Sequence, residues 1–103
     1  MEEGLYIVTF GVPGFFARGV AVLETNRFYG GDSVYYYSGE FNVKDDSFTG
    51  RGRVVVHTPG IATIFGSFEP DQRILIAGKV KDGKITGTIR PEGAPIPTFP
   101  IEL

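Results

Sequence analysis

The sequence predicts an all-β protein, a single up-and-down antiparallel barrel of about eight strands. Short stretches in which apolar and polar residues alternate recur along the chain, and a period of two is typical of strands with one buried face. Turn-forming residues separate these stretches at regular intervals, and no window shows the 3.6-residue period of a capped helix. Glycines recur on the apolar faces and allow the sharp coiling that closes a small sheet, which favours a barrel over a sandwich.

Composition limits the kind of protein that this chain forms. At 103 residues it predicts one domain, residues 1–103, and a hydrophobic content of 42% argues against disorder. A net charge of −2 disfavours direct binding of nucleic acid. The absence of cysteine excludes disulfides, thiolate catalysis and cysteine-ligated zinc. The acidic start of the chain is unlike a secretory signal and no apolar run approaches the ~18 residues of a membrane helix, so we expect a cytoplasmic protein.

The alternation predicts each strand in order, with polar turns between them. The predicted strands are residues 4–10, 18–24, 27–30, 34–43, 48–57, 62–68, 73–80 and 84–90. Asp82-Gly83 has the residues of a type I′ hairpin turn between the last two strands. The segment 91–100 holds four of the seven prolines, so it is expected to form only an edge strand or an extended tail.

The longest aromatic strand follows Gly30-Gly31-Asp32, which we interpret as a turn. Glycine adopts positive φ at low cost, and Asp32 is expected to hydrogen-bond the backbone just ahead of it. One face of the strand that follows is expected to be buried and carries Tyr35, Tyr37, Gly39, Phe41 and Val43. The other face is expected to be exposed and carries Val34, Tyr36, Ser38, Glu40 and Asn42. Tyr36 is therefore predicted to be an exposed interface aromatic.

The candidate functional residues are few and suggest no catalysis. No base, nucleophile and orienting group occur together, and His57 is interpreted as an ordinary turn histidine. No glycine loop enters a helix and no cluster of metal ligands is present, so neither a cofactor nor a metal is expected. Inward glycines, Gly78 and Gly87 among them, suggest interior space. Two interpretations follow, which the sequence does not separate: a small apolar ligand beside Tyr35, Tyr37 and Phe41, or a filled core of ordinary density.

Four blocks in the same order carry a family resemblance. They are the segments GLYIVTF at 4–10, GVAVL at 19–23, GGDSVYYYSG at 30–39 and IFG at 64–66. Read together, they resemble the GrlR-type negative regulators of type III secretion over nearly the whole chain. The resemblance implies a lipocalin-like, or calycin-like, β-barrel that is commonly a homodimer. It also implies an anti-activator, which binds a transcriptional activator and keeps it from promoter DNA without catalysis.

The resemblance also implies a partner-binding site. In the family an acidic surface loop binds the activator, and here it corresponds to the turn Lys44-Asp45-Asp46-Ser47. Asp45 and Asp46 match acidic positions of the family's loop, whereas Lys44 and Ser47 stand where the resemblance would lead us to expect further acidic residues. The first hypothesis is thus a non-enzymatic regulator that binds a protein through this turn and Tyr36. The second hypothesis is a carrier or sensor of a small apolar ligand inside the barrel.

Overall fold

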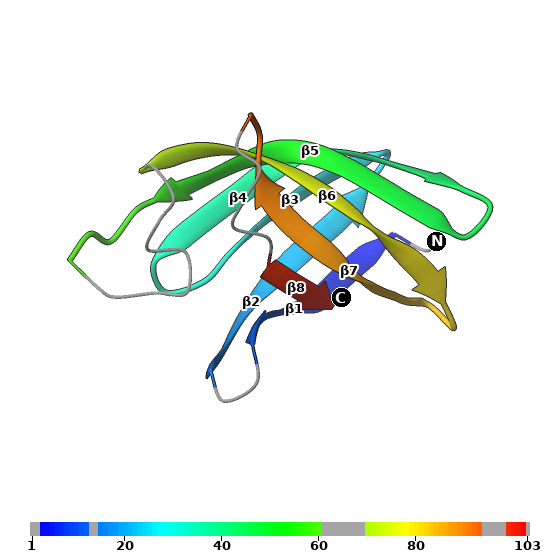
Figure 1. The fold of residues 1–103 in the computed structure, drawn as a ribbon, viewed down its shortest axis with the longest axis horizontal. Helices are drawn as coiled ribbons and strands as arrows, with labels where there is room; N and C mark the ends of the chain where they lie inside the picture. Colours follow the sequence, from blue (N-terminus) through cyan, green and yellow to red (C-terminus); the bar gives the residue numbers. More distant parts are fainter. Residues whose placement is uncertain (1–2, 13–14, 61–69, 94–98, 103) are drawn as a thin grey trace.

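The structure, a computed structural model, describes residues 3–12, 15–60, 70–93 and 99–102. Its strands are β1 (Gly4–Val12), β2 (Phe15–Glu24), β3 (Arg27–Gly31), β4 (Tyr35–Lys44), β5 (Ser47–Val56), β6 (Asp71–Lys81), β7 (Lys84–Pro91) and β8 (Phe99–Glu102). Each strand pairs antiparallel with the next strand along the chain, and the last strand, β8, also pairs with the first, β1 (Figure 1). The all-β class and the up-and-down, barrel-like architecture are confirmed.

The strand bounds differ from the sequence-based expectation at the ends of the chain. The strand predicted at 62–68 lies outside the described residues. In the proline-rich tail the strand is β8, which begins at Phe99 and has β7 on one side and β1 on the other. It is therefore not the edge strand that its prolines suggested, although its pairing with β1 covers only two residue pairs. In the ranges that the structure describes, no helix has the length and apolar character needed to cross a membrane.

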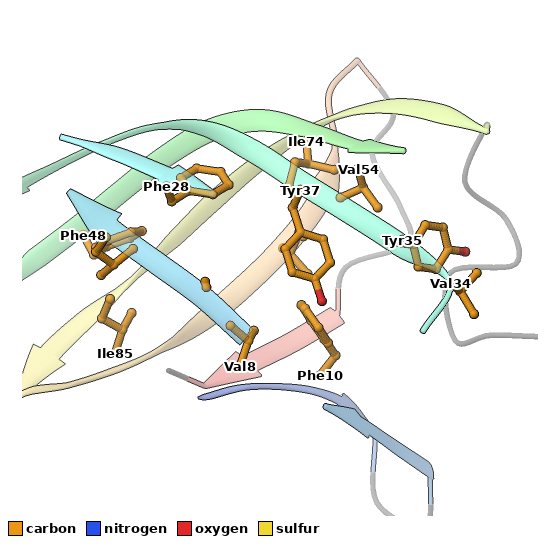
Figure 2. Packing of buried hydrophobic residues seen from close by; sticks show 13 residues of the cluster. Val8, Phe10, Phe28, Val34, Tyr35, Tyr37, Phe48, Val54, Ile74 and Ile85 are labelled. Carbon is orange, nitrogen blue, oxygen red and sulfur yellow. The ribbon is translucent and has the colours of Figure 1, made fainter. Parts of the chain in front are cut away.

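The predicted alternation of faces is confirmed along β4. Tyr35 and Tyr37 are buried, Phe41 is partly buried, and Tyr36 and Glu40 are exposed. Val34 is the exception: it was expected on the outer face, yet only 6% of it is exposed. It lies in the turn before β4, where the strand alternation does not yet apply, and its side chain sits beside Tyr35 at one end of the core (Figure 2).

Gly30 and Gly31 are not turn residues, which corrects the interpretation of that segment. Both lie in β3, and neither has a positive φ. Gly30 pairs with Ala21 on one side and with Tyr37 on the other, and a Cβ atom added to it would lie 2.1 Å from the Val20 carbonyl oxygen. Glycine is needed here because neighbouring backbones approach closely, and the turn itself begins at Asp32.

The two-residue hairpin turns agree with the sequence-based prediction better than the Gly30-Gly31 segment does. Asp82 and Gly83 have φ values of 53° and 76°, as a type I′ turn requires, so this prediction is confirmed. The polar turn Thr25-Asn26 has positive φ at both residues, 49° and 63°, and connects β2 to β3. These two-residue turns twist in the same sense as the strands that they join, and they keep the strands in register.

A row of residues across the sheet explains how it curls. Phe28, Gly39, Gly52 and Ile74 are successive cross-strand partners from β3 to β6. A Cβ atom on Gly39 or Gly52 would lie 2.7 or 2.8 Å from the Phe28 ring, so this ring covers the glycine pair from inside. Glycines beneath an aromatic ring let the strands bend inward while the ring supplies the apolar contact that they lack. The coiling role predicted for inward glycines is supported by this arrangement.

Candidate functional site

Asp32 organises one end of the barrel through its side chain. Its Oδ1 atom accepts hydrogen bonds from the N–H groups of Val34 and Tyr35, both at 2.8 Å, which confirms the predicted bonding to the backbone just ahead. Its Oδ2 atom accepts a hydrogen bond of 2.8 Å from the Tyr37 hydroxyl. The sequence contained no signal for this second contact, because it depends on where β4 carries Tyr37 relative to the turn.

Tyr37 has a buried hydroxyl whose pKa is shifted by its surroundings. Its ring reaches from β4 across the interior and meets Phe10 edge to face, with ring centroids 5.6 Å apart (Figure 2). Its hydroxyl lies where a Cβ atom on Gly19 would stand, which leaves no room for another side chain there. Burial raises the pKa of Tyr37 well above its usual value, and the hydrogen bond and negative charge of Asp32 raise it further.

We expect Tyr37 to remain protonated in the folded protein at alkaline pH. Below pH ~10 both states hold the proton, whereas above it only unfolded Tyr37 releases it, so the free energy of unfolding falls as pH rises. An absorbance titration of phenolate should show at least one of the five tyrosines ionising only on unfolding, and Tyr37→Phe should remove that step. Ionisation of all five tyrosines in a protein that is still folded would contradict the expectation.

His57 closes the same end of the barrel. Its Nε2 lies 2.9 Å from the Asp32 carbonyl oxygen and its Nδ1 lies 2.8 Å from the Thr58 hydroxyl oxygen. Because a carbonyl oxygen only accepts hydrogen bonds, Nε2 carries the proton and Nδ1 is left to accept from Thr58 in the neutral ring. The backbone N–H of His57 also donates a hydrogen bond of 2.8 Å to the Val34 carbonyl oxygen. All these contacts hold the turn, which agrees with the interpretation of His57 as a turn histidine.

The acidic turn is exposed, as predicted, but its charges are balanced locally. Lys44, Asp45 and Asp46 are all exposed at the β4–β5 hairpin. The Lys79 ammonium lies 3.5 Å from Asp46 Oδ1 and also donates a 3.1 Å hydrogen bond to the Ser47 hydroxyl. Two cations therefore accompany the two carboxylates, and the hairpin projects little net negative field.

A larger feature is an apolar face on the outside of four adjacent strands. The large hydrophobic residues that the structure shows as exposed are Leu5, Ile7, Val20, Val22, Tyr29 and Tyr36. In the strand register they form two neighbouring rows. One row runs through Leu5, Val22 and Tyr29, and the other through Ile7, Val20, Gly31 and Tyr36. We call this surface the β1–β4 face; it places the predicted exposed Tyr36 at the edge of a continuous patch.

Of this face, only Tyr36 was singled out from the sequence. A signal for the rest exists in the consecutive apolar residues of the segments LYIV at 5–8 and VAVL at 20–23. Such runs place apolar side chains on both sides of a strand, and one side of β1 and β2 packs into the core through Val8, Ala21 and Leu23. The other side faces outward, with Leu5 68% and Ile7 59% exposed.

The interior of the barrel is nearly filled. An apolar cavity of about 40 Å³ remains, lined by Val8, Phe10, Ala21, Leu23, Phe28, Tyr37, Phe48, Val54, Ile74, Ile76 and Ile89. This is space for roughly three water molecules. Of the interior residues predicted to hold a ligand, Tyr37 lines the cavity, while Phe41 stacks on Phe48 with ring centroids 5.2 Å apart.

Gly78 and Gly87 do not create the interior space that was expected of them. They are cross-strand partners, and a Cβ atom on either would meet backbone of the neighbouring strand, at 2.7 Å from the Thr86 oxygen or 2.0 Å from the Ala77 oxygen. The room that a side chain would need is taken up by the close approach of β6 and β7. Their lack of side chains serves strand packing and leaves no pocket.

Two further observations bear on function. Within the described ranges, no three His, Asp or Glu side chains come together in a group that would hold a metal ion. Comparison of the sequence with models of known protein families and with curated proteins finds no match.

Proposed function

We propose that this chain is a non-enzymatic protein-binding regulator that works as a homodimer. The observation that carries the proposal is the β1–β4 face, where the exposed large hydrophobic residues of the described chain gather on adjacent strands. Contiguous apolar patches of this kind mark interaction sites, whereas isolated exposed hydrophobic residues need no explanation. The resemblance to GrlR-type regulators supports the regulatory part of the proposal, together with a closed, lipocalin-like form of the barrel.

A second copy of the chain is the occupant that we assign to this face. A two-fold interface brings the same patch from both protomers together, so two rows of aliphatic residues with tyrosines at one edge are covered by the same set. Burial of one Ile or Leu side chain contributes about 1.5–3 kcal/mol, and in a symmetric dimer each residue contributes twice. A few aliphatic residues of the patch would therefore supply most of the free energy of dimerisation, and the two tyrosines would add apolar contact area while keeping their hydroxyls in water.

The dimer is tested with Ile7→Lys, which places a charge at the β1 end of the face. Ile7 is 59% exposed, so the change costs little in the folded monomer but leaves a charge buried in the dimer. We expect the dimerisation Kd to weaken about 100-fold or more, measured by analytical ultracentrifugation. Thr49→Lys on the outer side of β5 is the matched control and should remain dimeric. A monomeric parent protein, or a control that dissociates equally, would exclude this interface.

The regulatory activity is tested with a partner recovered from the host's soluble extract. Addition of the purified protein should release a co-purified transcriptional activator from its promoter DNA in a mobility-shift assay. Asp45→Ala with Asp46→Ala is assayed alongside, because the acidic turn remains the partner site that the resemblance implies. Full affinity of this double variant would remove the turn from the contact. An activator that stays on its DNA would contradict the anti-activator function.

The alternative is a carrier or sensor of a small apolar ligand. It is supported by the all-apolar lining of the interior cavity, but about 40 Å³ is far below the roughly 300 Å³ at which ligand pockets begin. A larger ligand would have to displace the Tyr37 or Phe28 ring from the core. Mass spectrometry of an organic extract of the purified protein tests it: a stoichiometric apolar compound would move the function to the interior.

A further inference from the structure

The outer side of β5, β6 and β7 carries mostly positive charge. These three strands contain seven Lys and Arg residues and a single acid, Asp71. All seven cationic side chains are exposed: Arg51, Arg53, Arg73, Lys79, Lys81, Lys84 and Arg90. The net charge of −2 for the whole chain conceals this surface, because all but one of the twelve acidic residues lie outside these three strands. Three of the seven cations nevertheless have an acidic neighbour: Arg51 has Glu92, Arg53 has Asp71 and Lys79 has Asp46. We call it the β5–β7 cationic face.

Four arginines meet at one border of this face, around a surface hollow of about 490 Å³. The hollow is lined by Arg27, Ser38, Gly39, Glu40, Arg51, Gly52, Arg53, Arg73 and Glu92. Ser38, Arg53 and Arg73 are cross-strand neighbours on β4, β5 and β6, and they place two guanidinium groups side by side next to a small hydroxyl. Neighbouring arginines with room between them suit a ligand that carries several carboxylates in succession.

Three of these arginines already contact carboxylates of the chain itself, which shows that carboxylates fit this surface. Arg53 binds Asp71 in a bidentate manner, with Nε donating to Oδ1 at 2.9 Å and Nη2 to Oδ2, and this hydrogen bonding lowers the pKa of Asp71. Arg51 lies 3.5 Å from Glu92 and Arg27 lies 3.6 Å from Glu40. Arg73, in contrast, has no carboxylate within ion-pair distance among the described residues. Glu40 and Asp71 are exposed and Glu92 is half-buried, so solvent screens these pairs and a partner's carboxylates can replace them.

We propose that the β5–β7 cationic face binds an acidic segment of a protein partner, centred on Arg53 and Arg73. The inference deepens the proposed protein-binding function and rests on it for the partner being a protein. The proposed partner segment is acidic, whereas the acidic turn by itself would suit a basic partner. The carboxylates of that turn are balanced by Lys44 and Lys79. Single-stranded nucleic acid is the competing ligand, because the exposed aromatics Tyr29 and Tyr36 border this face and the Tyr29 hydroxyl accepts a hydrogen bond from Arg27. The net charge of −2 for the whole chain disfavours it.

The test uses a fluorescein-labelled peptide of alternating glutamate and glycine, with affinity measured by fluorescence anisotropy. We expect Arg53→Gln with Arg73→Gln to weaken peptide binding about tenfold or more. We expect Asp71→Asn to strengthen it, because the substitution frees Arg53 from its internal carboxylate. A merely structural role of the Arg53–Asp71 pair predicts no such gain. The matched control is Arg18→Gln, compared with the single variant Arg73→Gln; it removes one positive charge outside the face and should change affinity little.

Each other outcome overturns the proposal. If Arg18→Gln weakens binding as much as Arg73→Gln, the peptide responds to the overall charge of the protein and does not bind at this face. If an oligodeoxythymidine of matched charge binds more tightly than the peptide, the face serves nucleic acid. If Asp71→Asn leaves peptide affinity unchanged, Arg53 is not part of the contact. Thermal unfolding of each variant identifies those that lose the fold.

The two proposals fail independently. Ile7→Lys changes the β1–β4 face alone, so it should dissociate the dimer and leave peptide affinity unchanged. Loss of peptide binding in an intact dimer removes the acidic-segment inference and keeps the dimer. A monomeric parent protein that binds the peptide through Arg53 and Arg73 keeps the cationic site and removes the dimer interface.

Discussion

Replacing Asp32 with alanine is expected to lower the free energy of unfolding by about 3 kcal/mol. The substitution removes the acceptor of two backbone N–H groups and leaves the Tyr37 hydroxyl without its carboxylate partner. A hydrogen bond to a charged group contributes about 1.5–3 kcal/mol, and an unpaired buried donor adds its own desolvation cost. The measurement is urea unfolding followed by circular dichroism, with the midpoint and slope fitted together.

A double-mutant cycle separates the contact with Tyr37 from the turn. Tyr37→Phe keeps the aromatic ring and both backbone hydrogen bonds of Asp32, so we expect a loss of about 1 kcal/mol. The double variant should cost less than the sum of the single ones, because both remove the same hydrogen bond. Asp46→Ala at an exposed hairpin is the control and should change stability by less than about 1 kcal/mol. Strict additivity of Asp32→Ala and Tyr37→Phe would show that their contact contributes nothing.

Gly87→Ala is expected to be comparably destabilising, by about 3 kcal/mol, although it adds a single methyl group. The new Cβ atom would lie 2.0 Å from the Ala77 carbonyl oxygen and 2.6 Å from the Gly78 Cα atom. Both obstacles are backbone atoms of β6, so β6 and β7 must separate and their ladder must distort. Thermal unfolding should show a clear drop in Tm, and hydrogen exchange should increase first along the β6–β7 ladder.

Gly50→Ala is the matched control for this prediction. Gly50 lies on the same inward side of a central strand, but the nearest atom to its added Cβ is the Glu40 oxygen at 3.3 Å. A shift of a few tenths of an ångström accommodates that contact, so we expect a change within about 1 kcal/mol. Equal losses for Gly50→Ala and Gly87→Ala would mean that conformational entropy, not close strand approach, determines the cost. The same clash means that a larger residue at Gly78 or Gly87 would report on the fold and not on a ligand inside the barrel.

The sequence predicted the exposure of individual side chains more reliably than the way in which they gather on a surface. Alternation correctly separated buried Tyr35 and Tyr37 from exposed Tyr36, because the pleat alone decides which side of a strand a residue faces. It did not reveal the β1–β4 face. That face depends on the register between strands, which aligns Leu5, Val22 and Tyr29 in one row although they are far apart in the chain.

The two-residue turns and the period of two, both local properties, determined the all-β class and most strand bounds. Only the tertiary structure showed that Gly30 and Gly31 lie in a strand, that Asp32 reaches Tyr37, and that seven cations share the outer side of β5–β7. These features depend on distances between strands, and a single chain does not encode such distances in any local pattern. Neighbouring strands set them when the sheet coils, because close backbone approach, buried hydroxyls and like charges meet only after the strands are paired.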